Sequence, residues 1–284
     1  MKSGEFMKLN FITNDYIIGW NILFQASISE VIHKHKMKLW KIYQKEYTKL
    51  EKDNIKILKE EEDFIPDDDT IYNLLFESEY YPIFKRESEK HRIYLMKTWD
   101  KYKRRINSFL KEIVRIPMNE EFDVFVTHPM LDVVSYIPKA NKYAFVWGRH
   151  NDNESDVKTV VDLVHFILRA KLRDFRKEDK EIVSAVLELA ITNELYTRLS
   201  GKSRYLDGES HLKALKRQLY PYWLMYLGAD KEDLVKYMRR DSIAFDINCY
   251  TIEPELRKVD LYDFIDFCAK NKKYIARISE QEVI

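Results

Sequence analysis

Apolar residues recur at helical spacing along most of the chain. The clearest stretch is 87–115, where alternating steps of four and three residues separate Leu95, Trp99, Tyr102, Ile106, Phe109 and Ile113. This period matches one face of an α-helix, so it predicts a helix that packs along a single stripe. The same spacing predicts one long or two short helices over 14–57, and helices over 157–171, 178–200, 211–227, 231–240 and 261–273.

The period changes to two beyond residue 117. Apolar Phe122, Val124 and Val126 alternate with residues of mixed polarity, and a second apolar run occupies 143–147. Alternation of this kind is typical of β-strands, and a short apolar run between turn residues is typical of a buried strand. We therefore expect two short strands joined by a loop that contains proline.

The small number of turn-forming residues determines the expected fold class. The 284 residues include 6 glycines and 7 prolines, whereas a sandwich or barrel of many hairpins would need more. The sequence predicts an α+β, mainly helical protein with a helical N-terminal region over 7–117. A second region over 118–284 begins with the small sheet and continues with a helical core. Residues 1–6 are interpreted as left by cloning, because an EcoRI site encodes Glu5-Phe6.

The charge and the cysteine content indicate which binding partners and which cellular compartment to expect. Lys and Arg number 48 against 47 Asp and Glu, which gives a net charge of +1, so no overall field favours nucleic acid or an anionic membrane. No apolar run reaches the roughly 18 residues of a membrane helix, and no secretory signal is recognisable. Cys249 and Cys268 are too few for a disulfide framework or a thiolate metal site. We expect a cytoplasmic protein.

A polar stripe interrupts the apolar helix predicted over 157–171. Asp162, His165 and Arg169 recur at i, i+3 and i+7, which places them on one face of the helix. The remaining positions of this helix are almost all apolar, so the helix is expected to be buried. Polar side chains in a buried helix need hydrogen-bonding or charged partners.

The next predicted helix carries a single ionisable residue in its apolar part. Glu188 is alone between Glu181 and Glu194, and burying an isolated carboxylate is costly unless it is paired, protonated or bound to metal. We expect His165 or Arg169 to be its partner. A buried network of this kind can also simply hold two helices together, without any catalysis.

This order of elements resembles the zincin metallopeptidases that use a glutamate as third zinc ligand. In that family a helix with the motif H-E-x-x-H supplies two histidine ligands and a glutamate base, and the next helix supplies the third ligand. On this chain the motif falls on Val161-Asp162-Leu163-Val164-His165. The resemblance covers 121–201 and implies a zincin-like core in the C-terminal region. It implies His165 and Glu188 as metal ligands and Asp162 in the place of the catalytic base.

Two departures from the motif weaken the implied zinc site. Val161 stands where the first histidine would be and offers no ligand atom. Asp162 is one methylene shorter than glutamate, so it falls short of a metal-bound water. We therefore expect zinc to bind weakly or not at all, and we interpret the chain as a pseudo-peptidase that binds a peptide or a protein. An active but atypical metal-dependent peptidase is the alternative.

The resemblance also implies where an extended peptide would bind. In zincins an edge strand next to the motif helix presents its backbone to the substrate by β-augmentation. We expect the strand over 143–147 to be that edge strand, beside the N-terminal end of the helix over 157–171.

A different enzyme class is suggested by two acidic-x-x-His pairs. Glu30 and His33 repeat the spacing of Asp162 and His165, and with Glu188 and Glu194 such pairs could form a carboxylate-bridged di-iron site in a helical bundle. About one such pair arises by chance in a chain of this composition. His33 also lies in a basic run that is typical of a solvated surface.

Arg86 and His91 fit a third pattern, the Arg-x4-His spacing of HEPN-type helical ribonucleases. In that class histidine and arginine act on a phosphodiester, but Glu87 follows the arginine here. We interpret residues 86–92 as a charged helix face. The basic clusters over 101–105 and 213–217 are likewise interpreted as solvated helix faces.

Overall fold

The structure is a computed structural model. It describes residues 7–24, 81–136, 143–149, 155–202, 205–206, 208–240, 256–273 and 275, with isolated positions between 33 and 52. The chain forms two compact units, of which the first contains 1–101 and 119–155 and the second contains 102–118 and 156–284. One change of unit therefore falls beside the boundary expected at residue 117, and two further changes follow residues 101 and 155.

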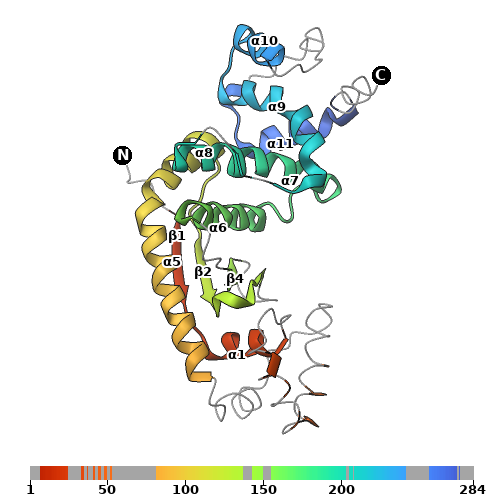
Figure 1. The fold of residues 1–284 in the computed structure, drawn as a ribbon. Coiled ribbons are helices and arrows are strands. Elements are labelled where there is room, and N and C mark those ends of the chain that lie inside the picture. The colour runs from red at the N-terminus through yellow and green to blue at the C-terminus, as the bar shows by residue number, and fades with distance from the viewer. Residues whose placement is uncertain are drawn as a thin grey trace. The chain divides into compact units, whose positions relative to one another are not determined.

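The first unit holds a four-stranded mixed sheet in the order β1-β2-β4-β3. The strands are β1 (Lys8–Ile12), β2 (Glu121–Val126), β3 (Val134–Tyr136) and β4 (Ala144–Trp147). β1, β2 and β4 run parallel, as Figure 1 shows, and β3 is antiparallel to β4. The register pairs Leu9 with Phe122, Val124 with Phe145, and Val134 with Trp147.

The two predicted strands are confirmed as β2 and β4. Phe122, Val124 and Val126 of β2 are fully buried on one face, and all four residues of β4 are buried, as expected for an interior strand. The expectation that 143–147 forms an edge strand is wrong, because β4 lies between β2 and β3. β1 and β3 were not predicted, since five and three residues are too few to show a period.

The helices of the first unit are α1 (Asp15–Phe24) and the beginning of α5 (Tyr81–Phe109). The predicted helix over 87–115 is confirmed, but it begins earlier because Pro82 occupies the first turn, where no backbone N–H is needed. Lys85 pairs with Asp15 at 3.0 Å and the Tyr81 hydroxyl donates to the same carboxylate at 2.5 Å. Most of the helix expected over 14–57 beyond Phe24 lies outside the described residues.

The second unit is helical in all its described elements. They include the end of α5 and short 3-10 turns over Lys177–Asp179, Ser210–Leu212 and Leu256–Lys258. The others are π-helical turns over Leu110–Val114 and Leu189–Leu195, and the helices α6 (Asp156–Lys171), α7 (Lys180–Glu188), α8 (Tyr196–Ser200), α9 (Lys213–Leu227), α10 (Lys231–Arg240) and α11 (Leu261–Lys270). α7, the π-helical segment and α8 form the single run predicted over 178–200. Gly201 and Gly228 end α8 and α9 in the left-handed conformation, which favours glycine.

Aromatic side chains of α9 and α11 form the centre of this unit. Trp223 stacks on Tyr226 with ring centroids 5.0 Å apart, and Phe264 lies 4.9 Å from Tyr226. The Arg115 guanidinium lies 4.8 Å from the Tyr226 centroid and donates to the carbonyls of Arg257 and Val259. Such contacts add to the large area that buried aromatic rings contribute.

The expected α+β, mainly helical class is thus confirmed. None of the helices in the described stretches has both the length and the apolar character needed to cross a bilayer.

Candidate functional site

α6 positions the polar stripe that the sequence singled out. Its apolar residues pack into the second unit, and Val161 is completely buried. Asp162 and His165 are half-buried, whereas Arg169 near the end of the helix is exposed. The stripe is therefore partly exposed along its length and most exposed at Arg169.

Glu188 ends α7 and is the most deeply buried carboxylate near this stripe, with only 2% of the residue exposed. Its Oε2 atom lies 2.6 Å from the Nζ atom of Lys216 on α9, and its Oε1 atom accepts the backbone N–H of Glu209 at 2.7 Å. The Lys216 side chain is itself only 15% exposed. The Lys216 ammonium balances the buried charge and the Glu209 amide bonds to Oε1, whereas Oε2 accepts no hydrogen bond from any described residue.

Gly208 brings the chain over this carboxylate at very short range. A Cβ atom at position 208 would lie 2.0 Å from Glu188 Oε2 and 2.6 Å from its Cδ, which is well inside van der Waals contact. The next residue supplies the amide that Glu188 accepts. Glycine is therefore needed here for close approach, a role that glycine serves at ligand sites and tight crossings alike.

His165 faces the same charged cluster without a direct bond to Glu188. Burial lowers the pKa of His165 below its usual value, the carboxylates of Glu188 and Glu209 oppose this shift, and the Arg169 guanidinium reinforces it. Glu209 in turn lies 3.9 Å from Arg169 and 3.6 Å from His211. The structure therefore gathers α6, α7, α9 and the segment 208–212 around one carboxylate.

The pairing of this cluster differs from the expected one. Glu188 was expected to meet His165 or Arg169, but Lys216 neutralises it, and Arg169 instead reaches Glu209 at the surface. The interpretation of 213–217 as a wholly solvated face is wrong for Lys216. Lysine can do this because its four-carbon stem packs along apolar surface while its ammonium reaches a buried acceptor.

The residues of this site do not fit a zinc ion. Among the described residues, no group of three histidine, cysteine, aspartate or glutamate side chains is placed to hold a metal. Val161 contributes no ligand atom, and Lys216 already neutralises the carboxylate that would be the third ligand. A metal would have to displace an ammonium that is held in a buried ion pair.

The described residues of the other two patterns differ in exposure and in their partners. Glu30 lies outside the described residues, and His33 is exposed. Glu194 pairs with Arg198 at 2.7 Å. On α5, Arg86 is exposed whereas His91 is buried, because five residues along a helix turn the side chain to a different face.

Comparisons with models of protein families, with curated proteins and with solved structures found no match for this chain. The resemblance to zincins therefore stays a prediction.

The burial of His165 predicts a loss of stability at acidic pH. Because the pKa of His165 is lowered in the folded protein, the unfolded chain binds more protons as pH falls through 6.5, so folding stability falls with it. The melting temperature of wild type should drop between about pH 7.5 and 5.5, and His165→Gln should reduce that drop. His211→Gln is the control, since that side chain is exposed. Equal pH profiles for wild type and His165→Gln would contradict the prediction.

Proposed function

We propose that this chain is a pseudo-peptidase: a peptide- or protein-binding module with a zincin-like core that works without a catalytic metal. The observation that carries the proposal is the 2.6 Å contact between Lys216 and Glu188. An ammonium thus lies against the carboxylate that the resemblance to zincins implies as a zinc ligand. Lys216 of the chain itself supplies the charge that balances this carboxylate.

The binding role is supported by a strand edge of the first unit that has no partner strand among the described residues. The amide of Gly148 donates to the carbonyl of Val133 at 2.7 Å, which makes residues 133 and 148 a hydrogen-bonded pair of the antiparallel ladder. Because such pairs alternate, Ser135 also faces β4, whereas Val134 and Tyr136 direct their backbone groups away from it. Among the described residues, none bonds to this outer edge of β3.

β3 is a better docking edge than β1 at the other side of the sheet. β1 carries Lys8, whose exposed ammonium pairs with Glu121 at 2.8 Å, and a charged side chain at an edge disfavours strand addition. β3 consists of Val134, Ser135 and Tyr136, with no charge. Met130, just before β3, is 53% exposed and offers a flexible apolar contact for a peptide side chain.

Zinc binding tests the metal-free core. We expect wild type to hold well under one equivalent of zinc and to show no chelator-sensitive peptidase activity, because a valine and an ion-paired glutamate leave too few ligands. Restoring the motif with Val161→His and Asp162→Glu should be insufficient while Lys216 holds Glu188. Adding Lys216→Met should raise zinc affinity by at least about tenfold over that double variant. Metal content and zinc-dependent melting temperature are the measurements.

Two outcomes would overturn the metal-free core. Stoichiometric zinc in wild type would mean that the Lys216–Glu188 pair yields to metal, and chelator-sensitive peptide turnover would identify an atypical active peptidase. If Lys216→Met does not change zinc affinity in the restored background, then Glu188 is not the third ligand and the core is not zincin-like.

Proline substitution on β3 tests the binding edge. Val134→Pro removes an outward N–H and should leave the ladder to β4 intact, so we expect folding to be retained and binding of an extended peptide to weaken by about tenfold, the value of one lost hydrogen bond at its upper range. The probes are peptides selected from a displayed random library on wild type. Ser135→Pro is the control, since it removes an inward N–H and should destabilise the sheet. Selected peptides that bind Val134→Pro as well as wild type would exclude this edge.

A further inference from the structure

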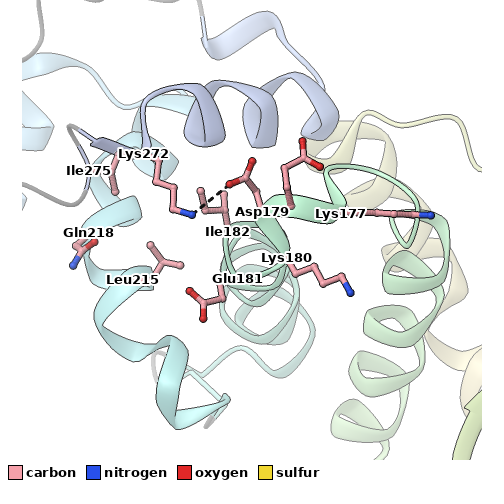
Figure 2. Close-up of a pocket in the computed structure, with 10 residues that line it drawn as sticks. Lys177, Asp179, Lys180, Glu181, Ile182, Leu215, Gln218, Lys272 and Ile275 are labelled. Atoms are coloured by element: carbon pink, nitrogen blue, oxygen red, sulfur yellow. Dashed lines mark hydrogen bonds and ion pairs between the residues drawn. The ribbon is translucent and has the colours of Figure 1, made fainter.

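The second unit contains a cavity of about 350 Å³ between the beginning of α7, the first half of α9 and the segment after α11, as Figure 2 shows. Its lining includes three lysines and three carboxylates, so charge favours neither an anion nor a cation. Ile182 and Ile275 are only 2% exposed and offer a ligand little apolar surface. The cavity therefore indicates no class of ligand, whereas a buried histidine of the first unit has a more specific role.

This histidine, His128, follows the end of β2, and its side chain caps the 3-10 turn Pro129–Leu131 that leads toward β3. The Nδ1 atom of the imidazole accepts the backbone N–H of Met130 at 3.3 Å. An imidazole nitrogen accepts a hydrogen bond only when it carries no proton, so this cap requires a neutral ring. In the protonated ring Nδ1 carries an N–H group, which cannot accept the Met130 N–H.

The surroundings of His128 favour the neutral ring. The residue is 8% exposed, and its ring lies edge-on to the Phe84 ring of α5 with the centroids 5.2 Å apart. Burial lowers the pKa of His128 below its usual value of 6.5, and the Glu87 carboxylate on α5 opposes this shift. Among the described residues Glu87 is the charged group that acts on His128, and it also pairs with Lys90 and Arg86. The cap is therefore intact at neutral pH and is lost as pH falls below 6.5.

The capped turn is connected to β3 by close packing. A Cβ atom at position 148 would lie 2.6 Å from Thr127 Cγ2, 2.9 Å from Val133 Cγ1 and 3.1 Å from the His128 carbonyl oxygen. The Gly148 amide also donates to the Val133 carbonyl at 2.7 Å. Because these segments leave no room between them, a change in the turn reaches Val133 and the beginning of β3. Met130, whose amide is capped, is also the exposed apolar residue beside the β3 edge.

We propose that His128 is a pH-sensitive switch for peptide binding at the β3 edge. The neutral ring caps the turn and holds Met130 and β3 in place for pairing with an extended peptide, and the protonated ring releases the turn. The inference rests on the proposed function, because it concerns the regulation of the same edge. Peptide binding and protonation of His128 oppose each other, so the partner is bound at neutral pH and released at acidic pH.

NMR titration of the free full chain between about pH 8 and about pH 4.5 tests the switch without any peptide. The His128 ring and the Met130 amide should titrate with one common midpoint, and protection of the Met130 amide from exchange should fall by about fivefold below it, the effect of a lost cap. Glu87→Gln should lower that midpoint, because the Glu87 carboxylate favours the protonated ring. A Met130 amide that does not respond when His128 titrates would overturn the proposal.

Binding is measured with end-capped peptides selected on wild type at neutral pH that contain no ionisable side chain. Their Kd should weaken by about fivefold between about pH 7.5 and about pH 5. His128→Asn keeps a side-chain acceptor that does not titrate, so it should bind with nearly the same Kd at both pH values. His165→Gln is the control for the acid instability expected from His165, and it should keep the fivefold change of wild type.

The outcomes distinguish the switch from the proposed function. If binding depends on Val134 but is equal at both pH values, the β3 edge stands and the switch is overturned. If the peptides bind Val134→Pro as well as wild type, the edge itself is excluded and the switch with it. A pH dependence that persists in His128→Asn overturns the switch, since another group is then responsible. If His128→Asn does not fold, the titration of the Met130 amide in wild type and in Glu87→Gln decides.

Discussion

Replacing Lys216 with methionine is expected to destabilise the protein by about 3–5 kcal/mol, the cost of leaving one member of a buried ion pair without its partner. Glu188 is 2% exposed and its Oε2 atom has the Lys216 ammonium at 2.6 Å. Methionine preserves the length and apolar contacts of the lysine stem, so the loss reports the charge rather than the packing. Chemical denaturation at neutral pH measures it.

Matched variants separate the ion pair from general effects. Lys213→Met changes an exposed lysine of the same helix and should alter stability by no more than about 0.5 kcal/mol. Glu188→Gln combined with Lys216→Met removes both charges and keeps an oxygen for the Glu209 amide, so it should be more stable than Lys216→Met alone. A loss in Lys216→Met as small as that in Lys213→Met would show that Glu188 is solvated.

The helical spacing of the sequence indicates that Lys216 faces inward, but a lysine is usually interpreted as exposed because it is charged. Lys216 lies on one stripe of α9 with Leu212, Leu219, Trp223 and Tyr226, at alternating steps of four and three residues. All four of these apolar residues are buried. The helical period thus placed Lys216 on the inner face, and a lysine stem with a buried acceptor fits there. Read together with the lone Glu188, the stripe would have predicted the pair.

Other features depend on contacts that no local pattern contains. β1 joins the sheet through β2, where Lys8 contacts Glu121 at a separation of 113 residues. A segment of five residues contains no pattern that predicts which distant strand it pairs with. The role of Gly208 depends on where Glu188 points after α7 and α9 have packed. By contrast, long helices such as α5 were predictable because their period repeats over many turns.

The sequence indicated that His165 and Glu188 belong to one polar cluster, because both are polar positions in apolar helices. It did not indicate which residue pairs with Glu188. Burial of an ionisable side chain demands a partner, but the sequence alone does not decide between a metal, a histidine and a lysine. The choice of Lys216 depends on how α9 packs against α7. A motif with one ligand missing therefore predicts which residues lie near one another more securely than it predicts what they bind or catalyse.

Gly208→Ala is expected to destabilise the protein by about 1–3 kcal/mol, the usual cost of overpacking a filled site. The new methyl group would lie 2.0 Å from Glu188 Oε2, so either the segment 208–212 or the carboxylate must move. Movement of either group strains the contacts that hold this carboxylate, which are the 2.7 Å bond from the Glu209 amide and the ion pair with Lys216. Thermal and chemical denaturation of the variant against wild type give the effect.

Removing the Glu188 carboxylate tests whether it is the group that a methyl group at position 208 would contact. In a Glu188→Ala background the three atoms nearest to the new methyl group at 208 are absent, so Gly208→Ala should cost much less there, and the two substitutions should show a coupling of about 1–2 kcal/mol. Gly201→Ala is the control, because Gly201 has φ +69° and a Cβ atom added there would have no atom within 4 Å, so its cost is backbone strain alone. Equal costs of Gly208→Ala with and without Glu188 would mean that the segment 208–212 does not lie over this carboxylate.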